Sequence, residues 1–410
     1  MHKLEIVAPA GSPEKLEYAV AYGADAVYLG GTDFGLRTAA ASFDRETMSR
    51  AVEFAHRRGV RVYVTVNIFA RNRDIEELPG YIEFLNHIGV DAVIVSDPGV
   101  LALVRETAPA LRVHVSTQAN TTNWRSAQTW TSLGAERIVA ARELSLEEIA
   151  TISKRAKTEL EVFVHGAMCI SYSGRCLLSN YMTGRDANRG DCAQSCRWKY
   201  RLVEEKRPGE IFPVYEDEQG TFIMSSRDLC LLEHLPGLAR AGVTAFKIEG
   251  RVKSIHYVAT VTGVYRRAVD AYMADPDGYR VQPGWLEEIG KVSNRDYTTG
   301  FISGTPGGTP PPVDSIYMRN YTFVGAVLGY DQDRKMLRVE QRNRFAVGQT
   351  LEIFAPGLET YQLQVKSILN EEGHPVEAAP HPRQIVYLPW TQPLPPYSLL
   401  RRGVQVRNGS

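Results

Sequence analysis

The amino-acid sequence predicts an α/β fold, in which a TIM-like (β/α)8 barrel carries a cysteine-bearing insertion and is followed by a small C-terminal β-barrel domain. Three observations support this prediction. Short apolar runs alternate with longer amphipathic runs up to about Ala274, one long segment interrupts that alternation, and a Gly/Pro-rich stretch precedes a β-rich C-terminal part. Continuous apolar strands are expected where helices cover a parallel sheet.

A doubly wound sheet is the alternative to the barrel. The number and spacing of the strands favour the barrel. No GxGxxG pattern follows the first strand, and Gly30-Gly31 after the second strand does not supply one. A dinucleotide-binding fold is therefore not expected.

The predicted barrel strands follow one another along the first part of the chain. They are Leu4–Ala8, Ala26–Leu29, Arg61–Val66, Ala92–Val95, Val113–Ser116, Ile138–Ala140, Leu160–Val164 and Ala245–Ile248. Helices are predicted between them, where Ser12 and Pro13 form a typical helix start and glycines mark helix ends. The clearest predicted helices are Arg45–Arg58, Ile75–Ile88 and His256–Met273.

The alternation breaks between the seventh and eighth strands, where an insertion spans about residues 166–221 within a barrel domain of residues 1–300. All five cysteines lie in the segment between these two strands. Alternating runs at Tyr200–Val203 and Phe212–Tyr215 predict a β-hairpin there.

A Gly/Pro linker is predicted at residues 301–317, and a small β-barrel domain at residues 318–410. The strands predicted for this domain are Phe323–Leu328, Met336–Val339, Thr350–Ile353, Gln362–Ile368 and Gln384–Leu388.

Composition excludes some classes of protein. Lys plus Arg equals Asp plus Glu, at 47 each, so the net charge gives no evidence for a nucleic-acid partner. No apolar stretch is long enough for a membrane helix, and residues Met1–Gly11 do not resemble a signal peptide. We therefore expect no membrane partner and a cytoplasmic location, in which cysteines stay reduced.

Polar residues follow the predicted strands, at the end where barrel proteins place their sites. They are Asn67, Asp97, Gln118, Asn120, Arg142, Glu143, His165, Lys247, Glu249 and Arg251. Loop-capping explains any single one equally well. Lys247 and Glu249 lie on the same side of a strand, so they are predicted to pair inside the mouth, either as site residues or as a structural ion pair.

Four cysteines, Cys169, Cys176, Cys192 and Cys196, follow a C-x6-C-x15-C-x3-C spacing. Four thiolates suit zinc or an iron–sulfur cluster, and the wide first gap favours the cluster because zinc sites use two close pairs. Buried cysteines without a metal are the structural alternative. Cys230 is predicted to be a core cysteine at a helix start.

A nucleophilic role is a separate possibility for the same segment. His165 precedes Cys169 by four positions, so the two could act as base and nucleophile. The sequence shows no obvious third, orienting group, and one nucleophile would not account for four cysteines.

Two stretches resemble the signature of the collagenase-like peptidases, family U32. They are Glu161-Val-Phe-Val-His-Gly-Ala-Met-Cys169 and Ile170-Ser-Tyr-Ser-Gly-Arg-Cys-Leu-Leu-Ser179. Flanking segments are also similar to the family, and the resemblance covers essentially the whole chain. These segments are Ala8–Gly11, Asp25–Tyr28, Asn188–Trp198 and Lys247–Arg251.

The resemblance implies one of several activities. The family name implies proteolysis of unknown catalytic type, while better-understood members serve oxygen-independent hydroxylation of tRNA, of 23S ribosomal RNA or of ubiquinone. The compact length, the Cys-x3-Cys-Arg-Trp ending and the single C-terminal domain are most similar to the tRNA branch. That branch hydroxylates C5 of the wobble uridine and uses prephenate.

The resemblance also assigns expected roles. A 4Fe-4S cluster would be held by Cys169, Cys176, Cys192 and Cys196, with Cys230 as a rival to Cys196. The expected catalytic groups are His165 and Glu249, and the expected substrate-binding groups are Asn67, Gln118, Arg142, Lys247 and Arg251. Prephenate would lie near Arg142, Lys247 and Arg251. The aromatic residues expected to stack on a flipped-out base are Tyr172, Tyr181 and Trp198.

The expected partners are tRNA and, as a further possibility, a homologous subunit. Two alternative functions remain at this point. One is a peptidase that uses a metal or the pair of Cys169 and His165. The other is a non-catalytic scaffold whose cluster is structural and which works with that homologous partner.

Overall fold

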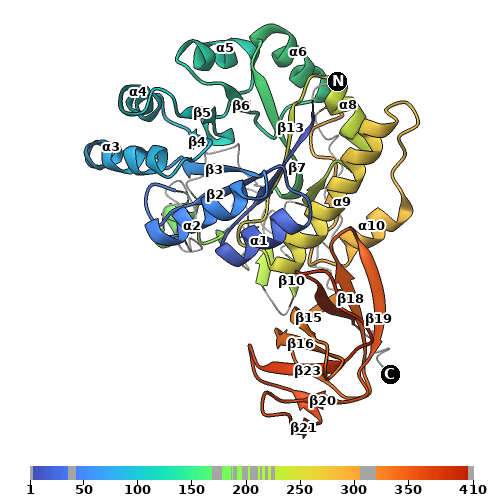
Figure 1. Ribbon diagram of the computed structural model, residues 1–410. Helices are drawn as coiled ribbons and strands as arrows, with labels where there is room; N and C mark the ends of the chain where they lie inside the picture. The colour runs from blue at the N-terminus through green and yellow to red at the C-terminus, as the bar shows by residue number, and fades with distance from the viewer. Residues whose placement is uncertain are drawn as a thin grey trace.

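A computed structural model describes most of the chain, in a larger domain and a smaller one joined end to end (Figure 1). The described residues are 3–35, 43–168, 178–185, 187, 192–195, 202–203, 211–212, 215–217, 220–222, 227–304 and 320–404.

Eight parallel strands form the barrel that the sequence predicts. They are β1 (Glu5–Pro9), β2 (Ala26–Gly30), β3 (Arg61–Val66), β4 (Ala92–Val95), β5 (Arg112–Val115), β6 (Arg137–Val139), β7 (Glu159–Ala167) and β13 (Ala245–Ile248). Each strand pairs with the next along the chain, and β13 pairs with both β7 and β1. This last pairing closes the sheet, so the barrel prediction is confirmed and the doubly wound alternative is wrong.

Helices cover the outside of the barrel. They are α1 (Pro13–Ala21), α2 (Arg45–His56), α3 (Asn72–His87), α4 (Pro98–Thr107), α5 (Trp124–Ser132), α6 (Leu146–Ala156), α8 (Leu235–Arg240), α9 (Ile255–Ala274) and α10 (Pro283–Gly290). Their starts follow ordinary capping rules, since Ser12 accepts a hydrogen bond from the Lys15 amide and Pro13 is the first helical residue. None of the helices in the described part of the chain is long and apolar enough to cross a membrane.

The barrel wall separates two apolar layers. A large core fills the space between strands and helices, whereas a small cluster that includes Val7, Tyr28, Tyr63 and Ile94 lies inside the barrel. Charged residues share that interior, and they include the buried side chains of Glu5, Arg137, Glu161 and Lys247. Barrel interiors are ordinarily filled with bulky apolar side chains. The buried charges of this barrel therefore depart from the usual apolar filling.

The insertion after β7 contains short elements among its described residues. They are α7 (Leu178–Thr183) and two antiparallel pairs, β8 (Leu202–Val203) with β9 (Ile211–Phe212) and β10 (Tyr215–Asp217) with β11 (Gly220–Phe222). The pairing of β8 with β9 confirms the predicted hairpin.

The environment of Cys230 corrects one prediction. Cys230 ends a strand, β12 (Asp228–Cys230), and does not start a helix. That strand pairs antiparallel with β7 and parallel with β14 (Tyr297–Thr298), while the helical turn η5 begins only at Leu232. The physical reason is tertiary, because the buried Asp228 carboxylate accepts a hydrogen bond from the equally buried Arg295 guanidinium at 3.1 Å.

The C-terminal domain is an antiparallel β domain, as predicted, with its own apolar core. Its main sheet has eight strands in the order β19-β18-β24-β15-β16-β23-β20-β21. The strands of this sheet are β15 (Tyr321–Asp331), β16 (Met336–Gln341), β18 (Thr350–Ala355), β19 (Glu359–Gln364), β20 (Ile368–Leu369), β21 (Pro375–Val376), β23 (Ile385–Pro389) and β24 (Leu399–Gly403). Two further strands, β17 (Phe345–Ala346) and β22 (Ala378–Ala379), form a separate antiparallel pair. The sequence did not predict β24, although it lies in the middle of the sheet. Most of the predicted linker at 301–317 falls outside the described residues.

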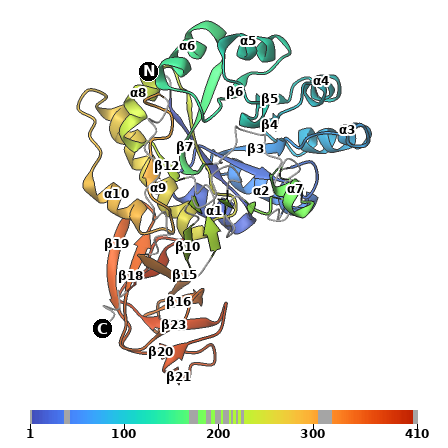
Figure 2. The same cartoon turned by 180° about the vertical axis from the view of Figure 1, so that it is seen from behind.

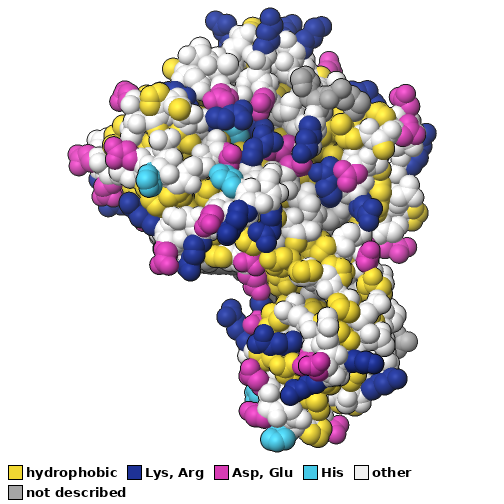
Figure 3. Space-filling view, viewed as in Figure 1, with side chains coloured by type: hydrophobic (Ala, Val, Ile, Leu, Met, Phe, Trp, Pro, Cys, Tyr) yellow, Lys and Arg dark blue, Asp and Glu magenta, His cyan; other side chains and the backbone are white. Residues whose placement is uncertain are grey.

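Specific contacts hold the two domains together. The Tyr22 hydroxyl on the barrel donates to the Phe354 carbonyl at 3.1 Å, and the rings of Tyr18 and Tyr397 meet edge to face. Arg401 is fully buried and pairs with Glu288 of α10 at 2.7 Å. Figure 3 shows hydrophobic side chains gathered where the domains meet, with both signs of charge interspersed over the rest of that face. The domains therefore form a packed unit.

Candidate functional site at the barrel mouth

The C-terminal ends of the barrel strands bring together the polar residues that the sequence singled out. Asn67 follows β3, Gln118 lies in the turn η2 (Thr117–Ala119) after β5, and Arg142 follows β6. His165 lies in β7, Lys247 lies in β13, and Glu249 and Arg251 follow β13 directly. Parallel strands end at one face of a barrel, so distant parts of the sequence meet at its mouth.

Amide and hydroxyl groups form one side of the mouth. The Asn67 side-chain amide donates to the Gln118 side-chain carbonyl at 3.0 Å and to the Ser116 hydroxyl at 3.2 Å. The Ser96 hydroxyl donates to the Asn67 main-chain carbonyl at 3.1 Å. Asn67 and Gln118, predicted independently, are therefore direct partners that connect the β3 and β5 loops.

Arg251 lies on another side of the mouth, nearly buried. Its guanidinium donates to the Thr65 hydroxyl at 3.2 Å and faces the Tyr28 ring, with 5.7 Å from guanidinium carbon to ring centre. The Arg251 main chain packs so closely on Gly11 that a Cβ there would lie 1.8 Å from the Arg251 carbonyl oxygen. Close backbone contact of this kind requires glycine, which explains Gly11 in the first loop of the mouth.

Glu249 is buried between β13 and the tyrosines around it. The Tyr28 hydroxyl lies 3.0 Å from the Ile248 carbonyl, to which it donates, and 3.3 Å from a Glu249 carboxylate oxygen. The Tyr257 hydroxyl donates to the Glu249 main-chain carbonyl at 2.8 Å. The carboxylate is thus oriented by packing, at the level where β13 opens into the mouth.

Lys247 does not pair with Glu249, which corrects the pairing that the period-two rule predicted. Its ammonium lies 2.5 Å from Glu161 of β7 and 4.3 Å from the centre of the Tyr28 ring. The register between β13 and β7 shifts between Lys247 and Ile248, so simple alternation of side chains does not continue past Lys247. The partner of Lys247 is Glu161 on the neighbouring strand β7. The alternation of side chains along β13 cannot identify a partner on another strand.

A chain of buried charges continues from this pair into the barrel. Glu161 also accepts from Arg137 at 3.1 Å, and Arg137 lies 2.7 Å from Glu5 near the opposite end of the barrel. Burial alone would raise the pKa of Glu161, but Lys247 and Arg137 outweigh it and hold that pKa below its ordinary value. Burial lowers the pKa of Lys247, and Glu161 opposes that shift. We conclude that Glu161 remains ionised and is shared between two cations.

His165 lies in an aromatic enclosure below the mouth. Its two ring nitrogens lie 3.4 Å from the Tyr265 hydroxyl and 3.5 Å from the Tyr297 hydroxyl. Complete burial, with a smaller effect of Lys253, lowers the pKa of His165 to about 3. An enclosed imidazole with so low a pKa is a weak base, which favours a structural role over that of a general base.

Arg142 contacts the last residue of β7, where the chain enters the insertion. Its guanidinium donates to the Ala167 carbonyl at 2.8 Å and lies over the Phe163 ring at 4.2 Å. Its Nε is buried without a hydrogen-bond partner. A buried orphan donor is unusual and often marks a place for a missing ligand or water.

Of the predicted thiolate ligands, Cys169, Cys176 and Cys196 lie outside the described residues, as do Tyr172 and Trp198. Cys192 is exposed, and its sulfur accepts a hydrogen bond from the Gln194 amide at 3.4 Å. Amide hydrogen bonds to sulfur are typical around cluster-bound thiolates, so this residue fits the proposed role. Within the described part of the chain, no group of three or more His, Cys, Asp or Glu side chains is arranged to hold a metal.

Cys230 has a different environment. Its backbone pairs with His165 across β12 and β7. Burial raises the pKa of its thiol, which favours the neutral form. A metal ligand must be a thiolate, so the surroundings favour the core role that the sequence predicted for Cys230.

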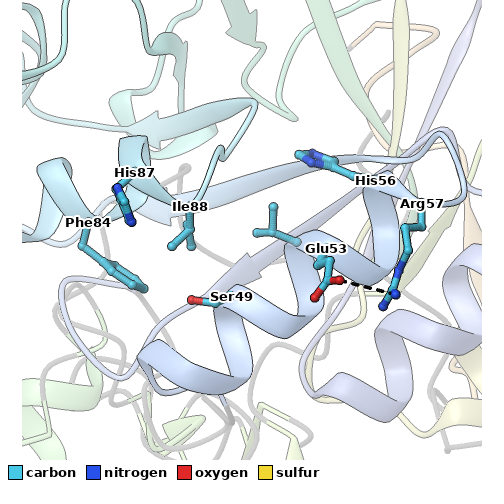
Figure 4. Close-up of a pocket in the computed structure, with 8 residues that line it drawn as sticks. Ser49, Glu53, His56, Arg57, Phe84, His87 and Ile88 are labelled. Carbon is cyan, nitrogen blue, oxygen red and sulfur yellow. Dashed lines mark ion pairs between the residues drawn. The ribbon is translucent and has the colours of Figure 1, made fainter.

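A groove of about 550 Å³ lies elsewhere, on the outer flank between α2 and α3 (Figure 4). Its lining includes Ser49, His56, Phe84 and His87, and an ion pair joins Glu53 to Arg57. None of the predicted site residues lines it, so we do not include it in the candidate site.

Sequence reasoning missed several residues of the mouth and the interior. Tyr28 and Thr65 contact Arg251, while Glu161 pairs with Lys247 and is itself shared with Arg137. A signal for the last two was available, because a charged residue inside an apolar strand is unexpected unless it is paired. Tyr28 carries no charge, so no such signal marked it.

These features define a class of protein, a closed (β/α)8 barrel with a polar mouth, a thiol-bearing insertion after its seventh strand and a C-terminal β domain. Residues 11–310 match the model of peptidase family U32, and residues 319–401 match that of the peptidase family U32 C-terminal domain. The chain therefore belongs to peptidase family U32, which confirms the resemblance seen in its sequence.

Two relatives match nearly the full length of the chain. The chain is 45% identical over 402 residues to tRNA hydroxylation protein P1 of Bacillus subtilis (strain 168), with 98% of this chain and 95% of that protein covered. It is 35% identical over 446 residues to tRNA hydroxylation protein P of Escherichia coli (strain K12), with 98% and 97% covered.

A third relative is similar over part of the chain. The 23S rRNA 5-hydroxycytidine synthase of the same Escherichia coli strain is 36% identical over 312 residues, which cover 75% of this chain and 46% of that protein.

Proposed function

We propose that this protein hydroxylates C5 of the wobble uridine in tRNA without molecular oxygen. The observation that carries the proposal is the similarity along the full chain to proteins named for tRNA hydroxylation. A second relative class, named for 5-hydroxycytidine synthesis in ribosomal RNA, also acts at position 5 of a pyrimidine. The polar barrel mouth supports the same activity, because a base taken out of its stack needs an enclosed polar site.

The reaction sets a chemical requirement. Replacing the C5–H bond of uracil by C5–OH removes two electrons from the base and adds one oxygen atom. A co-substrate and a redox group must therefore supply that oxygen and take up those electrons between them. Prephenate is the proposed co-substrate, and it carries two carboxylates.

Arg142, Arg251 and Lys247 are the proposed contacts for those carboxylates. Guanidinium groups pair well with carboxylates, and Arg142 keeps a buried Nε donor without a partner. Lys247 is already neutralised by Glu161, so we expect it to contribute less than the two arginines.

The proposed redox group is a 4Fe-4S cluster on Cys169, Cys176, Cys192 and Cys196, which would supply electron transfer when bound. The sulfur contact of Cys192 supports this assignment. Anaerobic reconstitution with iron and sulfide should produce a broad visible absorbance that is lost in Cys176→Ala. Stoichiometric zinc with no iron after anaerobic purification would contradict the cluster.

The test of the function itself is nucleoside analysis of tRNA. Cells that lack the gene, and any redundant pathway, should lose the pool of nucleosides derived from 5-hydroxyuridine. Plasmid-borne wild type should restore the pool, and Arg251→Met should not. An unchanged pool in the deletion strain would argue against the proposal.

Proteolysis is the second candidate function, and the family description favours it. It would need His165 to act on Cys169 or on a metal. The low basicity and the enclosure of His165 weigh against this role. Cleavage of a defined peptide by wild type but not by His165→Ala would support it.

The third candidate is a non-catalytic scaffold, whose cluster is structural and which works only in complex with a homologous partner subunit. Size-exclusion chromatography with and without such a partner would separate a stand-alone enzyme from a scaffold.

A further inference from the structure

Large hydrophobic side chains are exposed around the barrel mouth more than elsewhere. Nine such side chains are exposed among the described residues, and five of them lie on segments that follow β3, β7 and β13. These five are Phe69, Leu178, Tyr181, Met182 and Val252. The other four are scattered over the molecule. Clustered exposed apolar surface is a common mark of an interaction site, whereas single exposed residues need no explanation.

Two of the five are aromatic and highly accessible. Tyr181 on α7 is 86% exposed, and Phe69 after β3 is 42% exposed. Strands β3 and β7 lie on opposite sides of the closed barrel by their order in the sheet. In Figure 2, α7 lies on the same side of the barrel as α2. Helix α2 packs against β3, whose following segment carries Phe69, so α7 lies on the flank of the barrel that β3 forms.

Basic residues accompany these hydrophobic residues on each segment. Arg71 and Arg73 follow Phe69, and both are exposed. Arg185 follows Tyr181 on the insertion, and Lys253 follows Val252 after β13. The β2 and β4 loops carry the acidic residues Asp33 and Asp97 instead. Among the described residues, each of the three segments that carry exposed apolar groups therefore also carries a basic side chain.

We infer that this rim, defined as Phe69, Tyr181, Met182 and Val252 with their basic neighbours, binds the unpaired loop of the substrate RNA. Phe69 and Tyr181 provide surfaces on which bases stack, and Arg71, Arg73 and Arg185 contact phosphates. Aromatic side chains between basic ones are the usual arrangement of single-strand binding surfaces. The inference rests on the proposed function and specifies which part of the RNA the protein recognises.

The charge pattern favours RNA over a protein partner as the occupant. The core of a protein interface is depleted of charged residues, whereas here exposed cations lie next to each exposed ring. The rim also adjoins the polar mouth that a flipped base must enter. Unpaired bases that stack at the rim would leave the neighbouring base free to enter that mouth.

The direct test is the binding of a labelled anticodon stem-loop RNA to the full-length protein, measured by fluorescence anisotropy. Tyr181→Ala and Phe69→Ala should each weaken binding by roughly ten-fold, because stacking on one base contributes about that much. Tyr181→Phe keeps the ring and should bind within about two-fold of wild type. Wild type should bind a fully paired RNA of equal length more weakly than the stem-loop.

Matched controls separate stacking from general effects. Leu133→Ala removes a 45% exposed side chain away from the mouth and should leave RNA binding unchanged. Arg71→Ala should weaken binding to both RNAs alike and reduce the slope of log affinity against log salt by about one. Unfolding temperatures equal to that of wild type would show that the variants are folded.

Two results would overturn the inference. One is stem-loop binding by both alanine variants that equals wild-type binding. The other is equal affinity of wild type for paired and unpaired RNA. Loss of self-association in Tyr181→Ala with RNA binding intact would point to a protein partner and would also refute it.

The experiments distinguish failure of the proposed hydroxylation from failure of the rim inference. If nucleoside analysis shows no change in the deletion strain while stem-loop binding depends on the rim, the rim stands and the assigned reaction is wrong. If hydroxylation is lost in the deletion strain but Tyr181→Ala and Phe69→Ala restore it fully, the rim inference is wrong and the reaction stands.

Discussion

Glu161 on β7 and Lys247 on β13 form an ion pair inside the barrel, with 2.5 Å between the carboxylate oxygen and the ammonium nitrogen. Both side chains are buried, and Glu161 is shared with Arg137 at 3.1 Å. Buried ion pairs add little to stability compared with apolar packing. The pair lies directly beneath the mouth of the barrel. A role of its charges in the site therefore explains the pair better than a contribution to stability alone.

Breaking the pair should destabilise the barrel. Lys247→Met leaves a buried carboxylate with Arg137 as its remaining partner, and we expect a loss of about 3–5 kcal/mol in the free energy of unfolding. Urea unfolding measures this change. Arg50→Ala breaks the exposed pair with Glu46 on α2 and should cost less than about 1 kcal/mol. A Lys247→Met protein as stable as the Arg50→Ala control would show that the pair is dispensable for stability.

Acid should destabilise the protein through His165. Its pKa is about 3 in the folded protein, against about 6.5 in an unfolded chain. The unfolded state therefore takes up the proton first, so this stability is complete above about pH 6.5 and is lost as the pH falls toward 3. Between about pH 7.5 and about pH 5 the loss should be about 2 kcal/mol from this one residue.

Urea unfolding at the two pH values, with His165→Gln beside wild type, isolates this contribution. The variant lacks the titrating group and should show a smaller decrease in stability than wild type. His374→Gln removes an exposed histidine in the C-terminal domain and should leave the decrease unchanged. An identical decrease in His165→Gln and wild type would show that His165 is not buried as a neutral group.

Gly11→Ala should disturb the mouth. The new Cβ would lie 1.8 Å from the Arg251 carbonyl oxygen, so the Arg251 backbone has to move. We expect the free energy of unfolding to fall by about 1–3 kcal/mol. Hydroxylation in cells should be lost as well. Gly80→Ala is the matched control, because it lies in α3 with no atom within 4 Å of the added Cβ. It should stabilise the protein by up to about 1 kcal/mol.

Iron content should distinguish the two cysteines that the structure describes. Cys192→Ser should lose the visible absorbance and most of the iron after anaerobic reconstitution, because an exposed thiol with an amide donor is the proposed ligand. Cys230→Ala should keep its iron, since burial favours the neutral thiol there. The reverse result, with iron lost in Cys230→Ala and kept in Cys192→Ser, would assign Cys230 as the ligand.

Local patterns in the sequence predicted most of the barrel. All eight barrel strands occur within a residue or a few of their predicted positions, since each is a short apolar run between capped helices. Strand β24 was missed because its segment Leu399–Gly403 contains two arginines, and Arg401 is buried only through its pairs with Glu288 and Glu352. The strand β12 was missed for a similar reason, since the Asp228 carboxylate is satisfied by Arg295.

The candidate site likewise contains contacts that the sequence predicted and contacts that it could not predict. Asn67 and Gln118 could be proposed from their positions after strands, and the structure makes them partners. The partner of Lys247 could not be proposed, because a register shift ends the alternation along β13 and the true partner lies on β7.

The sequence by itself determined the order of the elements, the closed α/β architecture and the family, since these depend on local periodicity and on motifs read along the chain. It also supplied the four-cysteine pattern, whose role remains a proposal. Only the tertiary structure decided which charges neutralise one another in the barrel, that His165 is enclosed by tyrosines, and which exposed rings surround the mouth. Those outcomes depend on contacts between strands distant in sequence, and burial changes the energy of a charge or an imidazole only after such contacts exist.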